Sequence, residues 1–444
     1  ARVLGGAGTG KTVVAMHRAK HLASKCEGQQ RILVTTFTAN LAADIRENLR
    51  KICTLEELRR IEVIHLDAWV NQFLRESGFS AQIGYDDVIN PLWEKAVLSA
   101  NIDLPFETSF YEEEWNRIAI AQEALTLEKY VRATRNGRGT RLDRKKRMQV
   151  WKVFENYQNL MKENQIRDIN TAMYESTKLL QSVGRKPRYA SIIIDEGQDF
   201  SDNAYRLIRA LAGEEHPNDI FIVGDSHQRI YRNHPTLSKC GINVRGRSSI
   251  LKINYRTTEE IRKYAFALLN GISFDDLDEN SDLGDKCQSL THGEKPIVEN
   301  FENANDEFDF LLHEVKKLKE NGISLTDICV VARTKKLVDD YIALFTKAGI
   351  CAYVIKRNKV DDRSFDGLRV ATMHRVKGLE FKYVFIVAAN SRIIPLPSAI
   401  NKTDPVSEVE SVTSEKCLLY VAMTRAQKGV YITSYGRKSV FLKS

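Results

Sequence analysis

A glycine-rich stretch near the start of the chain carries the residue types that bind a polyphosphate. Glycines at positions 5, 6, 8 and 10 are followed directly by a lysine and a threonine. Glycine allows successive backbone N–H groups to turn inward around phosphates, while the lysine reaches the β and γ phosphates and the threonine ligates Mg²⁺. A helix opening at the lysine adds its positive dipole end. The sequence therefore predicts a phosphate loop with Mg²⁺, formed by Gly5, Gly6, Ala7, Gly8, Thr9, Gly10, Lys11, Thr12 and Val13.

An acid pair far downstream supplies what hydrolysis of the polyphosphate still needs. Asp195 and Glu196 follow three consecutive isoleucines, a pattern typical of a central strand covered on both faces. We expect Asp195 to hold Mg²⁺ and Glu196 to orient and deprotonate the attacking water. Negative charge that develops on the γ-phosphate needs cations besides Lys11. Arg256 and Arg425, in the second half of the chain, are the candidates. A site between two halves would sense the nucleotide through their closure.

The elements that must position these residues alternate between strand and helix in two halves. Strands are expected in the first half at residues 31–38, 61–65, 189–195 and 219–224. Those of the second half are expected at residues 250–253, 328–332, 352–355, 368–372, 383–389 and 430–433, with a last helix at 415–426. Ligands of open α/β folds bind at the carboxyl ends of parallel strands. The predicted class is α/β, with residues 1–77 and 186–248 in one unit and 249–444 in the other.

Residues 78–185 break this alternation with helical segments and predict an α-helical insertion in the first unit. The most basic stretch of the insertion contains Arg132, Arg135, Arg138, Arg141, Arg144, Lys145, Lys146 and Arg147. A solvated helix face explains such a run, and a track along a nucleic acid backbone is the alternative.

Bulk composition fits an ordinary globular protein of two or more domains. The formal charge is +8 over 444 residues, which suits a polyanionic partner without requiring one. Seven cysteines are scattered without a C-x-x-C pair, which indicates reduced thiols in the cytoplasm rather than disulfides or zinc. No apolar run approaches the ~20 residues that cross a bilayer, so we expect no membrane partner. Because the first residue is Ala1 rather than Met, we also expect an upstream segment to be missing.

The motifs, taken in order, resemble those of the UvrD/Rep-type superfamily 1 DNA helicases. They are the phosphate loop, Thr36-Phe37-Thr38, Asp195-Glu196-Gly197-Gln198-Asp199, residues 224–231, Asn254-Tyr255-Arg256, residues 372–380 and residues 420–426. The resemblance spans nearly the whole chain. It implies two RecA-like P-loop lobes with ATP between them and single-stranded DNA crossing both, in an ATP hydrolase that translocates 3′ to 5′.

The resemblance also implies roles for individual residues. Gln228 is similar to the γ-phosphate sensor, Tyr255 to the adenine-stacking residue, Glu380 to a nucleotide-site carboxylate, and Arg256 and Arg425 to the arginine fingers. The residues similar to those on the DNA path are Thr36, Phe37, His65, Tyr231, Thr372 and His374. A flat aromatic such as Phe37 can hold any base without reading its sequence, although a core aromatic is the alternative for it.

Three departures from the family pattern qualify these expectations. The glutamine that the family uses to read adenine would precede Ala1, and Asn233-His234 stand where the family usually has Trp-Arg. A large accessory subdomain is usually inserted between the motifs containing Arg256 and Thr372, and too little sequence is left there for one. We therefore expect the subdomain to be absent, with translocation retained and duplex separation poor.

Other functions share the same ATP site. An ATP-gated module that controls a partner protein or an upstream effector domain would keep every nucleotide motif while unwinding little. RNA could replace DNA as the track, since stacking aromatics do not exclude a 2′-hydroxyl. Repair, recombination and antiphage defence are all compatible with such a motor.

Overall fold

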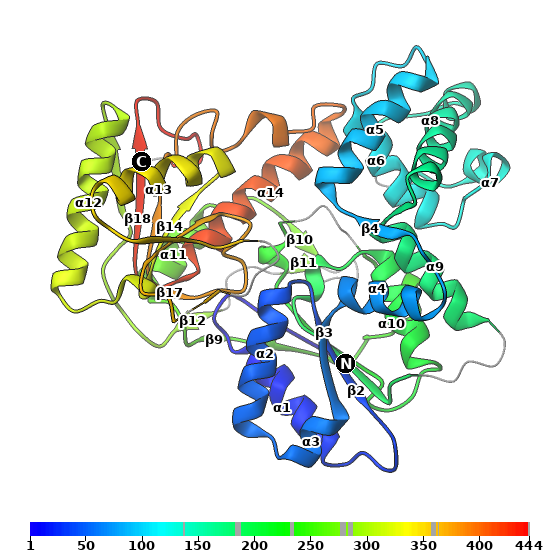
Figure 1. The fold of residues 1–444 in the computed structure, drawn as a ribbon, viewed down its shortest axis with the longest axis horizontal. Coiled ribbons are helices and arrows are strands. Elements are labelled where there is room, and N and C mark those ends of the chain that lie inside the picture. Colours follow the sequence, from blue (N-terminus) through cyan, green and yellow to red (C-terminus); the bar gives the residue numbers. More distant parts are fainter. Residues whose placement is uncertain are drawn as a thin grey trace.

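The computed structural model describes residues 1–135, 138–182, 188–230, 235–275, 281–282, 287–356, 361–362 and 364–442. Two α/β lobes lie side by side, and a helical unit stands above the first lobe next to the second (Figure 1). Each lobe contains a six-stranded sheet in which all pairings are parallel. The fold class predicted from the sequence, two RecA-like α/β lobes, is confirmed.

The first sheet runs in the order β3-β2-β6-β7-β1-β8. Its strands are β1 (Arg2–Gly5), β2 (Ile32–Thr36), β3 (Ile61–His65), β6 (Ser191–Ile194), β7 (Ile220–Gly224) and β8 (Ser248–Leu251). On one face lie α1 (Lys11–Ala23), α2 (Ala39–Ile52) and α3 (Leu55–Arg60), and on the other lie α4 (Leu66–Glu76), α9 (Ile169–Gln181) and α10 (Asp202–Ala212). Ile193 packs toward α1 and α2 while Ile192 and Ile194 pack toward α4 and α10, so β6 is the doubly covered strand that the sequence predicted.

The boundary between the lobes differs slightly from the one expected. Residues 250–253 were assigned to the second unit, but β8 pairs with β1, Arg2 opposite Ser248 and Gly5 opposite Leu251. The first sheet therefore extends past residue 248. At the other boundary, Ala172 and Met173 of α9 belong to the core of the first lobe, so the helical unit ends before residue 185.

The helical insertion is built around an aromatic core. Its helices are α5 (Asp86–Ala100), α6 (Thr108–Glu114), a π-helical turn (Trp115–Ile120), α7 (Leu127–Arg132) and α8 (Arg144–Glu163). Trp93 stacks on Tyr157 with ring centroids 3.6 Å apart, and Trp115 meets Phe154 edge-on. Strands β4 (Gln82–Gly84) and β5 (Ile166–Asp168) pair where the chain leaves and re-enters the first lobe.

Three arginines of the basic stretch belong neither to a solvated face nor to an open track, because their side chains have partners inside the insertion. The Arg135 guanidinium binds both oxygens of the buried Glu114 carboxylate, at 2.6 and 2.9 Å. Arg138 binds Glu113 and Glu114, and Arg147 donates to three backbone carbonyls at the end of α7. These three arginines stabilise the loop between α7 and α8, because fixed cations there satisfy buried acceptors. The exposed members of the stretch are Arg132, Arg141, Arg144, Lys145 and Lys146.

The second sheet runs in the order β13-β18-β17-β14-β16-β15. Its strands are β13 (Ile297–Phe301), β14 (Ile328–Ala332), β15 (Ala352–Val354), β16 (Leu368–Thr372), β17 (Phe381–Ile386) and β18 (Ala426–Tyr435). Helices α12 (Ala304–Glu320) and α13 (Lys335–Lys347) cover one face, and α11 (Glu259–Ala267) and α14 (Pro405–Met423) cover the other. The sequence missed the edge strand β13, and it expected α14 to begin at residue 415. The helix begins earlier because Asp404 caps it, accepting from the N–H groups of Val406 and Ser407, with Pro405 in the first position.

Between Arg256 and Thr372, the described residues build the second lobe itself. Three two-residue strands lie in this interval: β10 (Phe274–Asp275), β11 (Ser281–Asp282) and β12 (Gln288–Ser289). The other strands and the α-helices of the interval belong to the second sheet or cover it. No described segment there forms a core of its own, as expected for a chain without the accessory subdomain. In the part of the chain that the structure describes, no helix has both the length and the apolarity to cross a membrane.

Candidate functional site

The phosphate loop joins β1 to α1 and packs against residues 254–256, which follow the first lobe in the sequence. Gly8 and Gly10 have φ angles of 75° and 84°, in the left-handed region that favours glycine. A Cβ atom at Gly8 would lie 2.2 Å from Asn254 Oδ1 and 2.5 Å from Arg256 Cβ, so only glycine fits. The Tyr255 N–H donates to the Gly8 carbonyl at 2.9 Å. The loop is thus held in shape by the residues of the Asn254-Tyr255-Arg256 motif.

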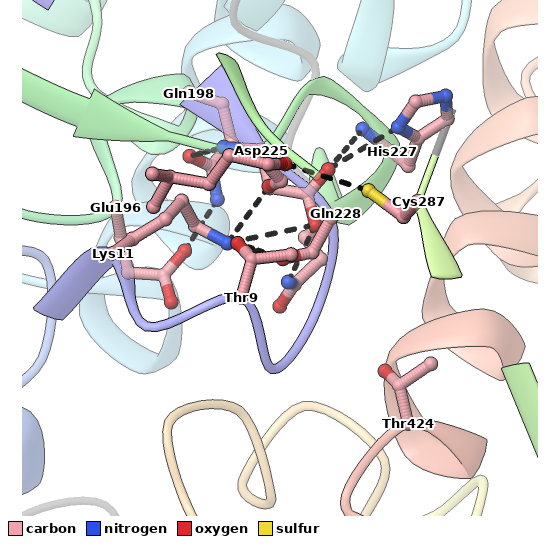
Figure 2. Close-up of polar contacts among 12 residues, drawn as sticks. Thr9, Lys11, Glu196, Gln198, Asp225, His227, Gln228, Cys287 and Thr424 are labelled. Atoms are coloured by element: carbon pink, nitrogen blue, oxygen red, sulfur yellow. Dashed lines mark hydrogen bonds and ion pairs between the residues drawn. The ribbon is translucent and has the colours of Figure 1, made fainter. Parts of the chain in front are cut away.

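The Lys11 side chain is buried within the loop. Its ammonium donates to the carbonyls of Gly5 and Gly6 at 2.9 and 2.8 Å and lies 3.8 Å from Asp225 Oδ2. Burial alone would raise the pKa of Asp225, but Lys11, His227 and Gln228 outweigh it and hold that pKa at about 2. Asp225 is therefore a fixed negative charge that orients the cation at the base of the loop (Figure 2).

Two side-chain oxygens of the kind that ligate Mg²⁺, from Thr12 and Asp195, lie close together at the phosphate loop. Thr12 Oγ1 donates to Asp195 Oδ2 at 2.7 Å, so one small ion could contact both oxygens. Burial and the charge of Glu196 raise the pKa of Asp195 to about 6. The donor set fits Mg²⁺, and the role of these two residues as its ligands stays a prediction.

Glu196 follows Asp195 on a turn with a left-handed backbone, φ 55°. Such a conformation costs a non-glycine residue about 1–3 kcal/mol, and residues that adopt it cluster at functional sites. Burial opposes ionisation of Glu196, yet the charges of Lys377, Lys11 and Arg425 lower its pKa. The carboxylate is therefore kept in the ionised form that a general base requires.

Gln228 joins the two lobes at this point. Its Nε2 donates to Asp225 Oδ2 at 2.7 Å, and its Oε1 accepts from the Arg425 guanidinium at 2.8 Å. Arg425 is only 1% exposed, and burial together with the nearby charge of Arg256 lowers its pKa to about 10. A cation of the second lobe thus contacts a side chain that is fixed to the phosphate loop through Asp225.

Sequence reasoning assigned no role to Gln198, although it lies inside a quoted motif. Its Nε2 donates to Glu196 Oε2 at 2.5 Å, and its Oε1 accepts from the Asp225 N–H at 2.9 Å. Gln198 therefore fixes the orientation of the Glu196 carboxylate relative to β7 (Figure 2). The signal available in the sequence was its position two residues after Glu196.

A cleft of about 1270 Å³ lies between the lobes and is lined by most of the residues predicted to bind the nucleotide. Its walls contain Gly8, Thr9, Gly10, Lys11, Thr12, Val13, Glu196, Gln228, Tyr255, Arg256, Glu380 and Arg425. Glu380 is paired with Arg256, and Tyr255 is 63% exposed, so its ring is open to a ligand. Gly5, Gly6, Ala7 and Asp195 lie behind this wall, where the first two accept from Lys11. The volume and the glycine cradle fit a nucleoside triphosphate.

A second cavity, of about 490 Å³, lies where both lobes and the insertion meet. It contains four of the residues predicted on the DNA path: Thr36, Phe37, Thr372 and His374. The Thr36 hydroxyl is fully buried and has no hydrogen-bond partner among the residues that the structure describes. Burial and the charge of Arg333 lower the pKa of His374 to about 4, so this ring is neutral.

Two further residues, His65 and Tyr231, were predicted on the DNA path. His65 is opposite Thr36 in the sheet but does not line the cavity. Tyr231 lies outside the described residues. The cavity also contains Arg375, which the sequence did not single out.

Two family models together match most of the chain. A family model described as the UvrD/REP helicase N-terminal domain matches residues 1–234, and the UvrD-like helicase C-terminal domain matches residues 249–365 and 357–437. The chain belongs to the UvrD/REP helicase family.

Relatives of this family member are similar along most of its length. A probable DNA helicase of Mycoplasma pneumoniae is 25% identical over 98% of this chain and 81% of its own length. The ATP-dependent DNA helicase PcrA of Leuconostoc citreum is 25% identical over 75% of this chain and 44% of its own. PcrA of Staphylococcus aureus is 23% identical over 90% and 53%. The chain thus spans about half the length of the two PcrA proteins.

In this UvrD/REP family member, Lys377 connects the two cavities. It comes from the second lobe, is 4% exposed, and donates to the backbone carbonyl of Gln228 at 2.7 Å. Its ammonium also pairs with Asp199 at 2.6 Å. Gln228 lines the nucleotide cleft and Asp199 lines the second cavity, so one side chain contacts a residue of each. Its motif was recognised from the sequence, but its partners Gln228 and Asp199 lie about 150 and 180 residues away along the chain.

Proposed function

We propose that the chain is an ATP-driven translocase on single-stranded DNA, moving 3′ to 5′, whose two lobes close on the nucleotide. The observation that carries this proposal is the contact between Arg425 of the second lobe and Gln228 of the first, inside one cleft with the phosphate loop. A ligand whose γ-phosphate lies between these lobes changes their closure when that phosphate leaves.

The residues of the cleft have distinct tasks in hydrolysis. Lys11 and the loop N–H groups bind the phosphates, and Glu196, held by Gln198, orients the attacking water and accepts its proton. Arg425 and Arg256 supply positive charge where it develops on the γ-phosphate. Mg²⁺ bound between Thr12 and Asp195 would neutralise phosphate charge. Tyr255 offers its exposed ring to the adenine.

The second cavity is where we propose that the strand binds. Phe37 presents an aromatic ring, Thr36 a buried hydroxyl with no partner in the described part of the chain, and Arg375 a cation for the backbone. Stacking and backbone charge bind any base sequence. Lys377 links this cavity to Gln228, so a change at the γ-phosphate can reach the strand through a short path.

Strand-stimulated ATP turnover tests the proposal. The wild-type chain should hydrolyse ATP faster with single-stranded DNA. Glu196→Gln should lose about 10²–10⁴-fold in turnover while still binding Mg-ATP, because it removes the base without adding charge at the phosphates. Glu62→Gln, on the edge strand β3 and in the wall of neither cavity, is the matched control and should turn over normally.

Each alternative function has its own outcome in this assay. If single-stranded DNA does not change the rate of ATP turnover, the ATP-gated module is favoured. If RNA stimulates turnover more strongly than DNA does, RNA is the track. Release of streptavidin from a 5′-labelled but not a 3′-labelled strand supports 3′ to 5′ movement. Full turnover by Glu196→Gln contradicts its assignment as the base.

A further inference from the structure

The helical insertion contacts the second lobe as well as the first. The Arg117 guanidinium, on the π-helical turn, binds both oxygens of Glu410 on α14 at 2.9 and 3.4 Å. Each of these side chains is about one-fifth exposed, so the pair is partly shielded from water. In Figure 1 the orange N-terminal end of α14 reaches the helices of the insertion. These segments lie almost 300 residues apart in the sequence.

A second set of contacts lies at the start of α14. Asn401 donates to Glu113, whose other oxygen is held by the buried Arg138. A Cβ atom placed on Gly139 would lie 2.1 Å from Asp404 Oδ1 and 3.1 Å from Asp404 Cβ. Only glycine allows the loop before α8 to approach this helix cap so closely. We call these two sets of contacts, made by residues 113, 117 and 138–140 with residues 401, 404 and 410, the latch.

The latch completes a closed ring of three bodies. The first lobe is joined to the insertion by the chain itself, through β4 and β5. The two lobes touch through Arg425 with Gln228 and Lys377 with Asp199. The latch supplies the third side, between the insertion and the second lobe. The second cavity lies inside this ring, since its wall takes Phe37 from the first lobe, Trp93 and Tyr157 from the insertion, and Thr372 from the second lobe.

We propose that the closed latch encircles the bound single strand, so that the chain loads on a free strand end and loads on a closed circle only after the latch opens. This inference rests on the proposed function, because it takes the second cavity as the strand site. It names the form of substrate that the site accepts. Its physical basis is topological: a strand within a ring of three connected bodies leaves only by sliding off an end or by parting one contact. The latch is the side of the ring that can part completely, because the chain itself joins the first lobe to the insertion and to the second lobe, whereas the latch consists of side-chain contacts alone.

A covalent lock on the latch tests this directly. The double variant Gly139→Cys/Asp404→Cys places the two Cβ atoms 3.1 Å apart, closer than the ~3.8 Å that a disulfide prefers, so the loop must shift outward slightly for the bond to form. Oxidation should then close the ring, and reductant should reopen it. Binding is measured on one linear oligo(dT) and on the same oligo(dT) ligated into a circle, with the oxidised and the reduced protein. Each single cysteine variant controls for the seven native cysteines. Arg117→Cys/Glu410→Cys, bridged with a bismaleimide, is a second lock if the first pair disturbs the helix cap.

The oxidised protein should bind the linear strand as the reduced protein does, and bind the circle at least ~100-fold more weakly, about 2.7 kcal/mol. Equal binding of circle and linear strand by the locked protein would overturn the inference, because the path would then be open at the side. If oxidation abolishes binding of both the linear strand and the circle, the inference is also overturned. If the reduced protein binds neither substrate, the strand site itself is wrong and the proposed function fails with it.

Discussion

Arg425→Ala should abolish most ATP turnover while leaving nucleotide binding nearly intact. Arg425 is almost fully buried and donates to Gln228 Oε1 at 2.8 Å inside the nucleotide cleft. Removing an arginine that stabilises a transferring phosphoryl group costs about 10³–10⁵-fold in rate. We expect the lower end, because Lys11 and Arg256 remain as cations in the same cleft. A loss of ~10³-fold in kcat corresponds to about 4 kcal/mol of transition-state stabilisation.

A double-mutant cycle with Gln228→Ala sharpens this expectation. The single Gln228 change should cost ~10²-fold, as for loss of one oriented hydrogen-bonding group at a transition state. Because the two side chains are bonded to each other, removing both should cost little more than Arg425→Ala alone. Steady-state turnover with saturating single-stranded DNA gives kcat, and equilibrium binding of a fluorescent ATP analogue gives the affinity.

Arg209→Ala is the matched control. Arg209 is a partly buried arginine whose guanidinium is paired with Asp219 at 2.6 Å, but it lies on α10 and lines neither cavity. It should lower thermal stability and leave kcat unchanged. A loss below about tenfold for Arg425→Ala would reduce that residue to a structural contact, since an arginine finger contributes far more. Fully additive losses in the cycle would show that the two residues act independently.

Two further predictions concern the insertion and the strand cavity. Arg135→Ala should destabilise the protein by about 3 kcal/mol, seen in urea unfolding followed by tryptophan fluorescence, because the buried Glu114 loses its bidentate partner. Arg132→Ala, at an exposed i,i+4 pair, should change stability by less than ~0.5 kcal/mol, and equal effects would contradict the burial argument. Arg375→Ala should flatten the log–log salt dependence of single-strand binding by about 0.7, as expected for one lost phosphate contact. The slope should stay unchanged when three exposed residues of the insertion, Arg141, Arg144 and Lys145, are neutralised together. A flatter slope in that triple variant would instead show that the strand contacts the outer surface of the insertion.

The sequence by itself predicted the phosphate loop and most of the framework. The glycines, lysine and threonine of residues 5–12 predicted the loop, because few other residues can adopt its backbone and bind phosphate. Three isoleucines before Asp195 predicted a doubly covered strand, and the structure buries all three completely. These features are local, so the residue types and their spacing suffice to recognise them.

Other local predictions were wrong at edges, where local patterns are weakest. The strand β13 begins Ile-Val-Glu-Asn, with little of the apolar run that marks a central strand. β8 is also an edge strand, with an exposed N-terminal half, and its place in the first sheet depends on pairing with β1, almost 250 residues earlier. Neither pairing leaves a periodic signal in the sequence.

Only the tertiary structure decided how charged and polar side chains were paired. Arg135 and Arg138 look like members of a solvated basic run until the fold places Glu113 and Glu114 beside them. Lys377 meets Asp199, and Arg117 meets Glu410, across separations of about 180 and 290 residues. A salt bridge needs only that two opposite charges meet in space, so its partner cannot be read from spacing along the chain. The contacts that join the two cavities and close the latch are of this kind, and they exist only once both lobes and the insertion have come together.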